Sequence, residues 1–243
     1  MGRLELADRR VVITGAGRGI GREIALVLAA HGLEEILVAR SREELERTAE
    51  EVRNLGSRAR VITADLAELE SLGSVVDTIA ETAERIDILV NNAGTAFAEP
   101  FESTTPEQWE RVLRLNAGSP FFLTQKALPL LEKSDIPTVV NISSNLGQKG
   151  YALQSAYSAS KHALAGWTKA VARELHDRGF WIFTVSPGGV ETTLVTKTRP
   201  DLDTSILIDP REIAETVEFL ITRSGRGSID EITLRRSAST PWQ

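Results

Sequence analysis

The stretch VVITGAGRGIGREIALVLAAHG, residues 11–32, decides the fold of this chain. It begins with a β-branched apolar run at 11–14, passes through a glycine-rich turn at 15–21 and continues as a small, apolar helical segment at 19–31. Glycines between a strand and a helix let the backbone turn tightly and approach a pyrophosphate, whose charge then lies at the helix N-terminus. This context predicts a nucleotide-binding strand–turn–helix unit, and the plainer alternative is a helix start without a ligand.

The alternation of strand and helix patterns continues along the rest of the chain. Six further β-branched runs are apolar on consecutive residues, at 36–39, 60–63, 87–90, 138–143, 181–186 and 231–234. Helical patterns lie at 41–55, 71–84, 106–133, 151–177 and 210–222, the first with Ser41 as a plausible N-cap and Glu44 three residues on. Continuous apolar runs are typical of strands buried on both faces of a parallel sheet. The alternation predicts an α/β Rossmann fold: one doubly wound domain with a mainly parallel seven-stranded sheet and helices on both faces.

Irregular stretches at 95–105, 145–150 and 192–209 each follow a predicted strand. Loops at the carboxyl ends of strands border the ligand crevice of a doubly wound sheet, so these three stretches should surround the site. No repeat, low-complexity tract or linker divides the chain, which predicts a single domain over residues 1–243.

The composition excludes several classes of protein. The 243 residues have a net charge of −6, 42% hydrophobic residues and no cysteine. Such an apolar fraction suffices for a packed core, and an acidic balance argues against a nucleic-acid partner. Without cysteine, and with His31, His162 and His176 widely spaced, no metal site is expected. The charged N-terminus and the absence of a long apolar run predict a cytoplasmic protein that does not associate with a membrane.

The end of the second predicted strand bears on the choice of cofactor. NAD-binding proteins usually place Asp or Glu about 20 residues beyond the glycine-rich turn, whereas an arginine suits the 2′-phosphate of NADP. Residues 38–41 read Val-Ala-Arg-Ser, with Arg40 and no acid, while Glu34 and Glu35 precede the strand at its wrong end. Arg18 lies inside the glycine turn. The two arginines favour NADP(H), with NAD(H) possible, and the alternative is that both are solvated surface charges.

A phenol and an ammonium group stand four residues apart, at Tyr157 and Lys161. On a helix this spacing puts both side chains on one face. A nearby cation favours the phenolate and lowers the tyrosine pKa toward a useful acid–base range. Ser144 follows a strand end that should face the same crevice. Ser143 is the nearest rival, but one step along a strand turns a side chain to the opposite face.

Together these motifs resemble the classical short-chain dehydrogenase/reductase family, in the right order and over nearly the whole chain. The matching elements are Thr14–Gly21, Asp65-Leu66, Asn91-Asn92-Ala93-Gly94, Asn116, Ser144, the Tyr-x-x-x-Lys at 157–161, and Pro187-Gly188-Gly189-Val190-Glu191-Thr192. The polar ending at 228–243 is more similar to carbonyl and sepiapterin-reductase-like members than to acyl-carrier-protein ketoreductases, which usually end in a glycine-rich segment.

The resemblance implies roles for individual residues. Tyr157 would donate a proton to the carbonyl oxygen during reduction, Ser144 would hydrogen-bond that oxygen, and Lys161 would lower the Tyr157 pKa and bind the nicotinamide ribose. Asn116 would hold a water that links Lys161 to solvent, and Asn91 would stabilise neighbouring strands. The implied cofactor contacts, besides Tyr157 and Lys161, are Gly15, Gly17, Arg18, Gly19, Ile20, Gly21, Arg40, Asp65, Leu66, Asn92, Ala93, Gly94, Pro187, Gly188, Val190 and Thr192.

The resemblance therefore implies an NADP(H)-dependent oxidoreductase that reduces a small-molecule ketone or aldehyde, or oxidises the alcohol. It assigns cofactor-binding elements to residues 1–143 and catalytic and substrate-binding elements to 144–243. One alternative is a 3-oxoacyl-[acyl-carrier-protein] reductase. A second is an NADP(H)-sensing binding protein without turnover, against which the retained Ser, Tyr and Lys argue. Family members typically pair through two long helices, here 106–133 and 151–177, which implies a homodimer or homotetramer.

Overall fold

The computed structural model describes residues 4–199 and 203–241, and its strands form one seven-stranded sheet in the order β3-β2-β1-β4-β5-β6-β7. Every strand pairs in parallel with its neighbours. The strands are β1 (Arg10–Thr14), β2 (Glu34–Ala39), β3 (Arg58–Thr63), β4 (Ile88–Asn91), β5 (Thr138–Ile142), β6 (Trp181–Pro187) and β7 (Glu231–Leu234). The predicted doubly wound fold is confirmed, and each predicted strand boundary lies within about two residues of the observed one.

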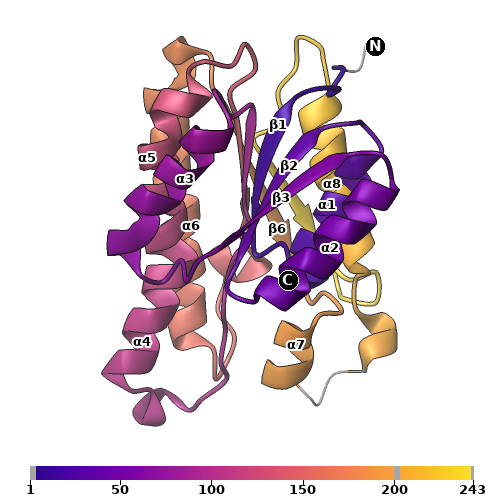
Figure 1. The fold of residues 1–243 in the computed structure, drawn as a ribbon. Helices are drawn as coiled ribbons and strands as arrows, with labels where there is room; N and C mark the ends of the chain where they lie inside the picture. The colour runs from indigo at the N-terminus through magenta and orange to yellow at the C-terminus, as the bar shows by residue number, and fades with distance from the viewer. Residues whose placement is uncertain (1–3, 200–202, 242–243) are drawn as a thin grey trace.

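Helices cover both faces of the sheet (Figure 1). One face carries α1 (Gly19–Ala29), α2 (Arg42–Asn54) and α8 (Pro210–Thr222), and the other carries α3 (Leu72–Thr82), α5 (Ser119–Leu131) and α6 (Ser155–Glu174). Successive strand side chains point to opposite faces, so Ile13 and Leu37 join one apolar core while Val12 joins the other. Both faces of the strands are therefore buried, as their continuous apolar runs predicted.

The predicted helix at 106–133 is interrupted. It consists of α4 (Pro106–Leu113), a π-helical segment at Arg114–Gly118, and α5. Pro120 has no backbone N–H, so it cannot close an α-helical hydrogen bond to the carbonyl of Asn116 four residues earlier. Single π-helical turns of this kind occur frequently at functional sites.

Two further expectations are corrected at the strand ends. The stretch 192–209 was expected to be irregular, but it contains α7 (Thr193–Thr198), which Thr192 caps by accepting a hydrogen bond from the Val195 N–H at 3.4 Å. Residues 200–202 of this stretch lie outside the described part of the chain. Glu34 and Glu35 do not precede β2 but form its first two residues, still at the end away from the glycine turn.

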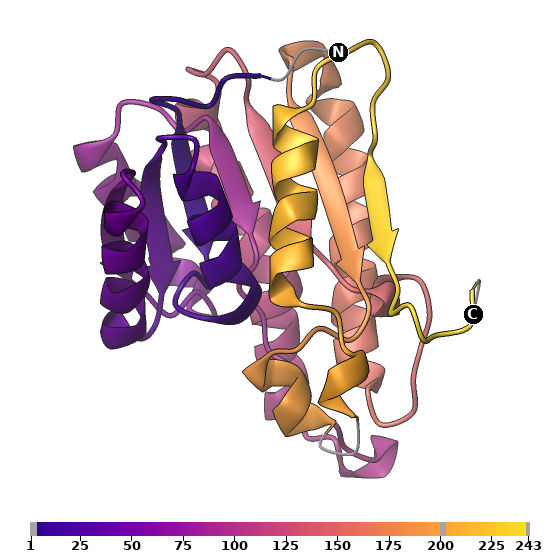
Figure 2. The same ribbon diagram turned by 90° about the vertical axis from the view of Figure 1, so that its right-hand side faces the viewer.

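The arrangement places one set of loops together. The carboxyl ends of the strands all lie at the same edge of the parallel sheet, and α7 lies beyond that edge (Figure 2). Within 4–199 and 203–241, none of the helices combines the length and the apolar character that crossing a membrane requires.

Candidate active site

A cavity of about 640 Å³ lies at the carboxyl ends of the strands, a volume in the range of small-molecule sites. The sequence-predicted residues that line it are Gly15, Gly17, Arg18, Gly19, Ile20, Arg40, Asp65, Leu66, Asn92, Ala93, Gly94, Ser144, Tyr157, Lys161, Pro187, Gly188, Val190 and Thr192. Two of the predicted site residues, Gly21 and Asn116, are not part of its wall. Parallel topology thus gathers motifs that are up to about 180 residues apart in the sequence.

The glycine turn is shaped to let a ligand approach its backbone. Gly15 and Gly19 have φ values of +67° and +56°, in the left-handed region that favours glycine. A Cβ atom on Gly19 would lie 3.2 Å from the Thr192 methyl, and one on Gly21 would lie 2.3 Å from the Gly15 carbonyl oxygen. Close packing beneath the turn therefore requires a glycine at position 21.

The N-terminus of α1 opens into this cavity without a side-chain cap. Arg18, at the N-cap position, makes no capping hydrogen bond, and the first turn carries no acidic residue. The first N–H groups of a helix have no intrahelical partner, and together with the helix dipole they favour an anion. The turn and helix end therefore fit the pyrophosphate of a dinucleotide.

Asn92 and Thr14 hold the turn in place. The Asn92 side-chain amide donates to the carbonyls of Thr14 at 2.9 Å and Gly15 at 3.3 Å. The Thr14 hydroxyl oxygen accepts from the backbone N–H groups of Asn92 at 2.9 Å and Ala93 at 3.0 Å. Asn92 thus lines the cavity while its amide braces the glycine turn.

Asn91 points elsewhere. Its amide donates to the Asn141 side chain on β5 at 2.8 Å and to the Thr124 hydroxyl on α5 at 3.0 Å. All three residues are buried. Asn91 therefore ties β4 to its neighbours, in agreement with the role that the resemblance implied.

The two predicted phosphate-binding arginines are both engaged by carboxylates. Arg18 Nη1 lies 3.0 Å from Glu44 Oε1, and Arg40 Nη1 lies 3.8 Å from Asp65 Oδ2. The side chains of both arginines are more than half exposed, at 58% and 54%. Ser41 accepts from the Glu44 N–H at 3.3 Å, which confirms the predicted N-cap. The Glu44 carboxylate itself goes to Arg18 rather than back to the cap.

Tyr157, Ser144 and Lys161 meet at the cavity wall. Ser144 follows β5, and its hydroxyl lies close enough to the Tyr157 phenol to lower the pKa of that phenol. The same hydroxyl accepts from the Leu146 N–H at 3.2 Å and donates to Asn145 Oδ1 at 3.3 Å. The Ser143 hydroxyl is buried without a hydrogen-bond partner among the described residues. Of the two serines, Ser144 is therefore the one that lies beside the tyrosine. One helical turn beyond Tyr157, Lys161 places its Nζ 5.8 Å from the centre of the tyrosine ring.

Burial controls the ionisation of this group. It raises the pKa of Tyr157 to about 12, and the neighbouring Ser144 hydroxyl lowers that pKa by a smaller amount. It lowers the pKa of Lys161 to about 8, because this residue is only 4% exposed. The Lys161 ammonium donates to the Ile142 carbonyl at 2.9 Å, which does not make up for the lost water. The expected lowering of the tyrosine pKa by Lys161 is not found: the loss of water around the phenolate raises this pKa, and the smaller opposing contribution comes from Ser144.

Asn116 lies behind the wall rather than in it. Its amide donates to the Thr95 carbonyl at 2.8 Å and to the Ser160 hydroxyl at 3.0 Å, and its oxygen accepts from the Thr95 N–H at 2.8 Å. The side chain therefore connects the loop after β4 to α6. The expected water site would have to use the backbone carbonyl of Asn116, to which Pro120 offers no N–H.

The stretches 95–105 and 192–209 do border the cavity, as expected, but several residues of its wall were not named individually from the sequence. They are Ala39, Ser41, Glu44, Ala64, Thr95, Ala96, Leu115, Ile142, Ser143, Thr193, Leu194, Val195, Lys197 and Thr198. The five from 193 to 198 belong to α7, whose only local signal is Thr192 as a possible N-cap. The sequence indicates for Glu44 only an interaction with the N-cap residue Ser41. Sequence spacing does not reveal that α2 places Glu44 beside Gly17.

Comparisons with known proteins agree with this geometry. The family model of the short chain dehydrogenases matches residues 9–203. The short-chain dehydrogenase/reductase FrzI of Cladobotryum sp. is 38% identical over 192 residues, 78% of this chain and 74% of that protein. The 3-oxoacyl-[acyl-carrier-protein] reductase FabG of Aquifex aeolicus is 34% identical over 226 residues, 89% of this chain and 91% of that protein. The structure of a metagenomic short-chain oxidoreductase in complex with NADP is similar with a TM-score of 0.84 and 28% identity, covering 97% of this chain and 100% of that one.

Proposed function

This chain belongs to the short-chain dehydrogenase/reductase family, an oxidoreductase family, and on that premise we propose that it interconverts a ketone or aldehyde and the corresponding alcohol with NADP(H). The observation that carries the proposal is the meeting of Tyr157, Ser144 and Lys161 at the wall of the cavity that the glycine turn also lines. Residues 1–143 supply most of the cofactor contacts, and 144–243 supply the acid–base group and the substrate loops.

The side chains divide the work of carbonyl reduction among themselves. The nicotinamide, when bound, supplies the hydride. The Ser144 hydroxyl holds the carbonyl oxygen, and Tyr157 donates its phenolic proton to that oxygen. A pKa of about 12 keeps this phenol protonated at neutral pH, ready for donation. The Lys161 ammonium stabilises the phenolate that forms, and the carbonyl of Asn116 anchors a water through which the proton is replaced.

The choice of NADP(H) rests on charge at the end of β2. Arg18 and Arg40 both line the cavity, and β2 ends at Ala39 with no carboxylate to receive a ribose 2′-hydroxyl. Arginine suits the 2′-phosphate because its planar donors match phosphate oxygens. The NADP held by the similar metagenomic oxidoreductase supports this choice.

A second candidate is the reduction of a 3-oxoacyl group on acyl-carrier protein. The 34% identity to the FabG protein of Aquifex aeolicus favours it. Residues 235–243, which follow β7, are mostly polar and contain no glycine, and this composition favours a free ketone or aldehyde instead.

A homodimer or homotetramer is part of the proposal. The outer face of α6 exposes Ala163, Gly166 and Ala170, and a Cβ on Gly166 would meet no atom within 4 Å. The indole N–H of Trp167, on the same helix, is buried and has no hydrogen-bond partner among the described residues. Small exposed side chains allow a second helix to approach closely, which supports pairing of two copies through α6.

The test is carbonyl-dependent oxidation of NADPH and NADH, measured side by side over diketones, aldehydes, cyclic ketones and an acetoacetyl thioester. Tyr157→Phe removes only the phenolic oxygen and should lower kcat/KM at least about 100-fold. Tyr151→Phe is the matched control, because Tyr151 is exposed and does not line the cavity. Equal rates for Tyr157→Phe and the parent protein would refute the mechanism, and a large preference for the acetoacetyl thioester over the free ketones and aldehydes would favour the second candidate.

A further inference from the structure

Glu44 places a negative charge where the proposed cofactor would bring another. It is the third residue of α2, and its carboxylate lines the cavity beside Arg18. A Cβ added to Gly17 would lie 2.9 Å from the Glu44 Cβ, so the side chain packs directly against the glycine turn. The packing of α2 against the turn therefore fixes the position of Glu44, which does not behave as a freely moving surface side chain.

The ion pairs around the two arginines differ in one respect. Asp65 lies 3.8 Å from Arg40 and also 3.8 Å from Arg111, so it keeps a cationic partner when Arg40 turns toward a ligand. Glu44 forms an ion pair only with Arg18 among the described residues. Any anion that binds Arg18 must share that guanidinium with Glu44 or displace it.

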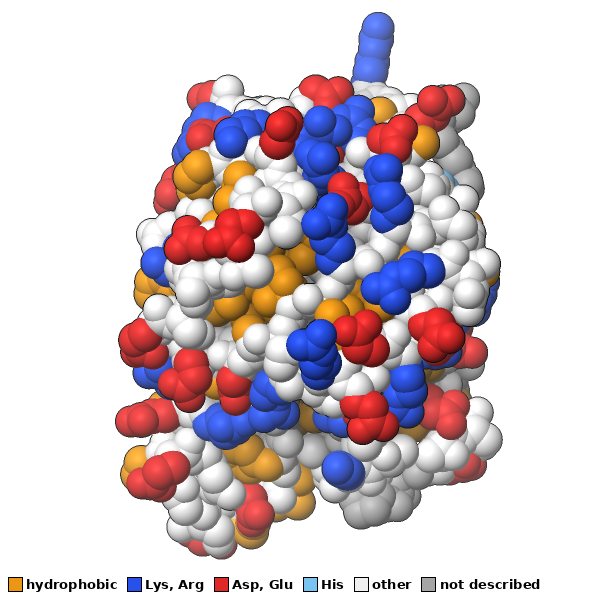
Figure 3. Space-filling model, viewed as in Figure 1, with side chains coloured by type: hydrophobic (Ala, Val, Ile, Leu, Met, Phe, Trp, Pro, Cys, Tyr) orange, Lys and Arg blue, Asp and Glu red, His pale blue; other side chains and the backbone are white. Residues whose placement is uncertain are grey.

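The charge around the site sharpens this competition. Acidic and basic side chains are interspersed over the face drawn in Figure 3, without a large patch of one sign. In the wall of the cavity, Glu44 and Asp65 offset the charges of Arg18 and Arg40. The wall also contains Lys161 and Lys197. A 2′-phosphate adds about two negative charges, whereas a 2′-hydroxyl adds none.

We propose that the Glu44 carboxylate competes with the cofactor 2′-phosphate for Arg18. By pairing with Arg18, Glu44 lowers the preference of the protein for NADP(H) over NAD(H). The inference rests on the proposed use of NADP(H). It makes Glu44 a specificity-determining residue that acts through Arg18, with no part in proton or hydride transfer.

The experiment measures binding rather than turnover. Isothermal titration calorimetry with NADP⁺ and with NAD⁺ is run on the full chain, on Glu44→Gln and on Glu43→Gln. Glu44→Gln should tighten NADP⁺ binding about two- to fivefold, the size expected for losing one partly exposed ion pair, and leave NAD⁺ binding unchanged. Glu43→Gln should change neither, because Glu43 shares the first turn of α2 but does not line the cavity.

A double-mutant cycle tests the route through Arg18. In an Arg18→Ala background, Glu44→Gln should give no more than a small gain in NADP⁺ affinity. The gain in the parent background should also shrink as salt rises, since the pair is partly exposed. A thermal unfolding curve confirms that each variant is folded, and the N-cap bond to Ser41 uses the backbone N–H and survives the substitution.

Three results would overturn the inference. Weaker NADP⁺ binding by Glu44→Gln would mean that Glu44 positions Arg18 for the phosphate, weaker NAD⁺ binding would mean that Glu44 holds the ribose, and unchanged binding would mean that it does not compete. Failure of the proposed cofactor choice appears separately, as tighter binding of NAD⁺ than of NADP⁺ by the unmodified protein.

Discussion

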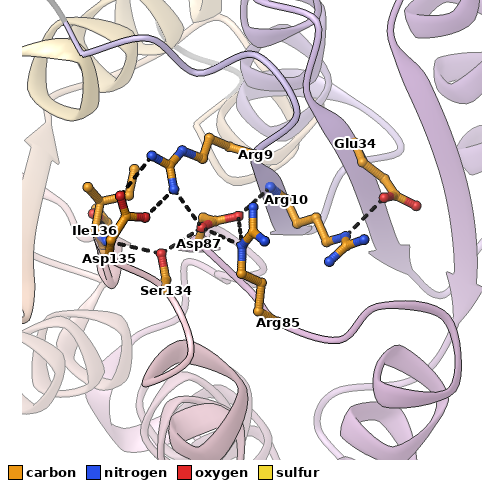
Figure 4. Close-up of polar contacts among 9 residues, drawn as sticks. Arg9, Arg10, Glu34, Arg85, Asp87, Ser134, Asp135 and Ile136 are labelled. Carbon is orange, nitrogen blue, oxygen red and sulfur yellow. Dashed lines mark hydrogen bonds and ion pairs between the residues drawn. The ribbon is translucent and has the colours of Figure 1, made fainter.

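The two ends of the sheet hold buried charge in opposite ways. At the amino end, the fully buried Asp87 carboxylate accepts from the Arg10 N–H at 2.8 Å, the Ser134 hydroxyl at 2.6 Å and Arg85 Nε at 3.0 Å (Figure 4). At the carboxyl end, the buried Lys161 ammonium donates only to the Ile142 carbonyl among the described residues.

The ionisation of the two groups reflects this difference. Burial alone would raise the Asp87 pKa, but the hydrogen bonds from Ser134, Arg10 and Arg85 hold it below its ordinary value of 3.8. For Lys161, burial is uncompensated and lowers the pKa to about 8. At the amino end, the Asp87 charge is stabilised by donors within the protein, whereas the candidate active site keeps a charge whose missing partners a ligand can supply.

The largest effect on stability should come from removing the hydrogen-bonded Asp87 carboxylate at the amino end of the sheet. Asp87→Asn should lower the free energy of unfolding by about 3 kcal/mol, because it removes a buried carboxylate that several donors share. Asp135→Asn is the control: this carboxylate also binds Arg9 but its side chain is 70% exposed, so its loss should cost under about 1 kcal/mol. Urea denaturation measures both, and equal losses would contradict the comparison.

The pH dependence of the same contact has a definite sign. Because the Asp87 pKa is lower in the folded protein than the ordinary value of 3.8, the stabilisation is present above that pH. It should be lost as the pH falls through the folded value. Asp87→Asn should therefore flatten the acid limb of the stability curve.

At the carboxyl end of the sheet, replacing Lys161 should reduce the activity of the protein without lowering its stability. Lys161→Met replaces a poorly satisfied ammonium with an apolar chain of similar length, so the free energy of unfolding should stay equal or rise. Carbonyl-dependent NADPH oxidation should fall at least about 100-fold in kcat/KM. Since the folded pKa lies below the ordinary 10.5, the parent protein should gain stability from about pH 8 to 10, and the variant should not. A loss of more than about 2 kcal/mol in the variant would assign Lys161 a structural role.

The smallest expected effect on stability concerns Glu35, a buried carboxylate at the amino end of the sheet that, unlike Asp87, has no hydrogen-bond donor among the described residues. Glu34 is bound by Arg10 and Arg60, each at 3.0 Å, but both carboxylate oxygens of the buried Glu35 have no hydrogen-bond partner among the described residues. Burial raises the Glu35 pKa to about 9 from an ordinary 4.5. The folded protein therefore binds this proton more tightly, and stability should be lost as the pH rises from 4.5 toward 9.

Glu35→Gln tests that exception. Between pH 5 and pH 6.5 the parent protein should lose about 2 kcal/mol more of its unfolding free energy than the variant does. Urea midpoints at three pH values in this range give the comparison. Parallel curves for the two proteins would mean that Glu35 finds a partner in solution.

Much of the fold was readable because its signals are local. Runs such as 11–14 and 138–143 are apolar on consecutive residues, and such a continuous apolar run is what identifies a strand buried on both faces. The exceptions are also local in origin but weaker: Pro120 does mark the break before α5, and Thr192 does cap α7. Neither outweighs an apolar helical pattern or a loop-like composition, so the continuous helix and the irregular loop were the natural expectations.

The candidate site could be predicted only where a residue type or a short spacing determines the local backbone or side-chain geometry. The glycine turn and the four-residue spacing of Tyr157 and Lys161 each fix a local shape, and both lie at the cavity as expected. The pairing of Arg18 with Glu44 was not predictable, because it depends on how α2 packs against the turn. The high pKa of Tyr157 was missed for a similar reason, since desolvation depends on all the surrounding elements.

The sequence by itself determined the order of strands and helices, the glycine turn and the Tyr–Lys spacing, because each follows from backbone preference or helical periodicity over a few residues. Only the tertiary structure decided which charges are satisfied. It surrounds Asp87 with donors, leaves Lys161 with one carbonyl, and sets Glu44 against Arg18. Hydrogen bonding and desolvation depend on groups brought together from distant parts of the chain, so no short stretch of sequence contains them.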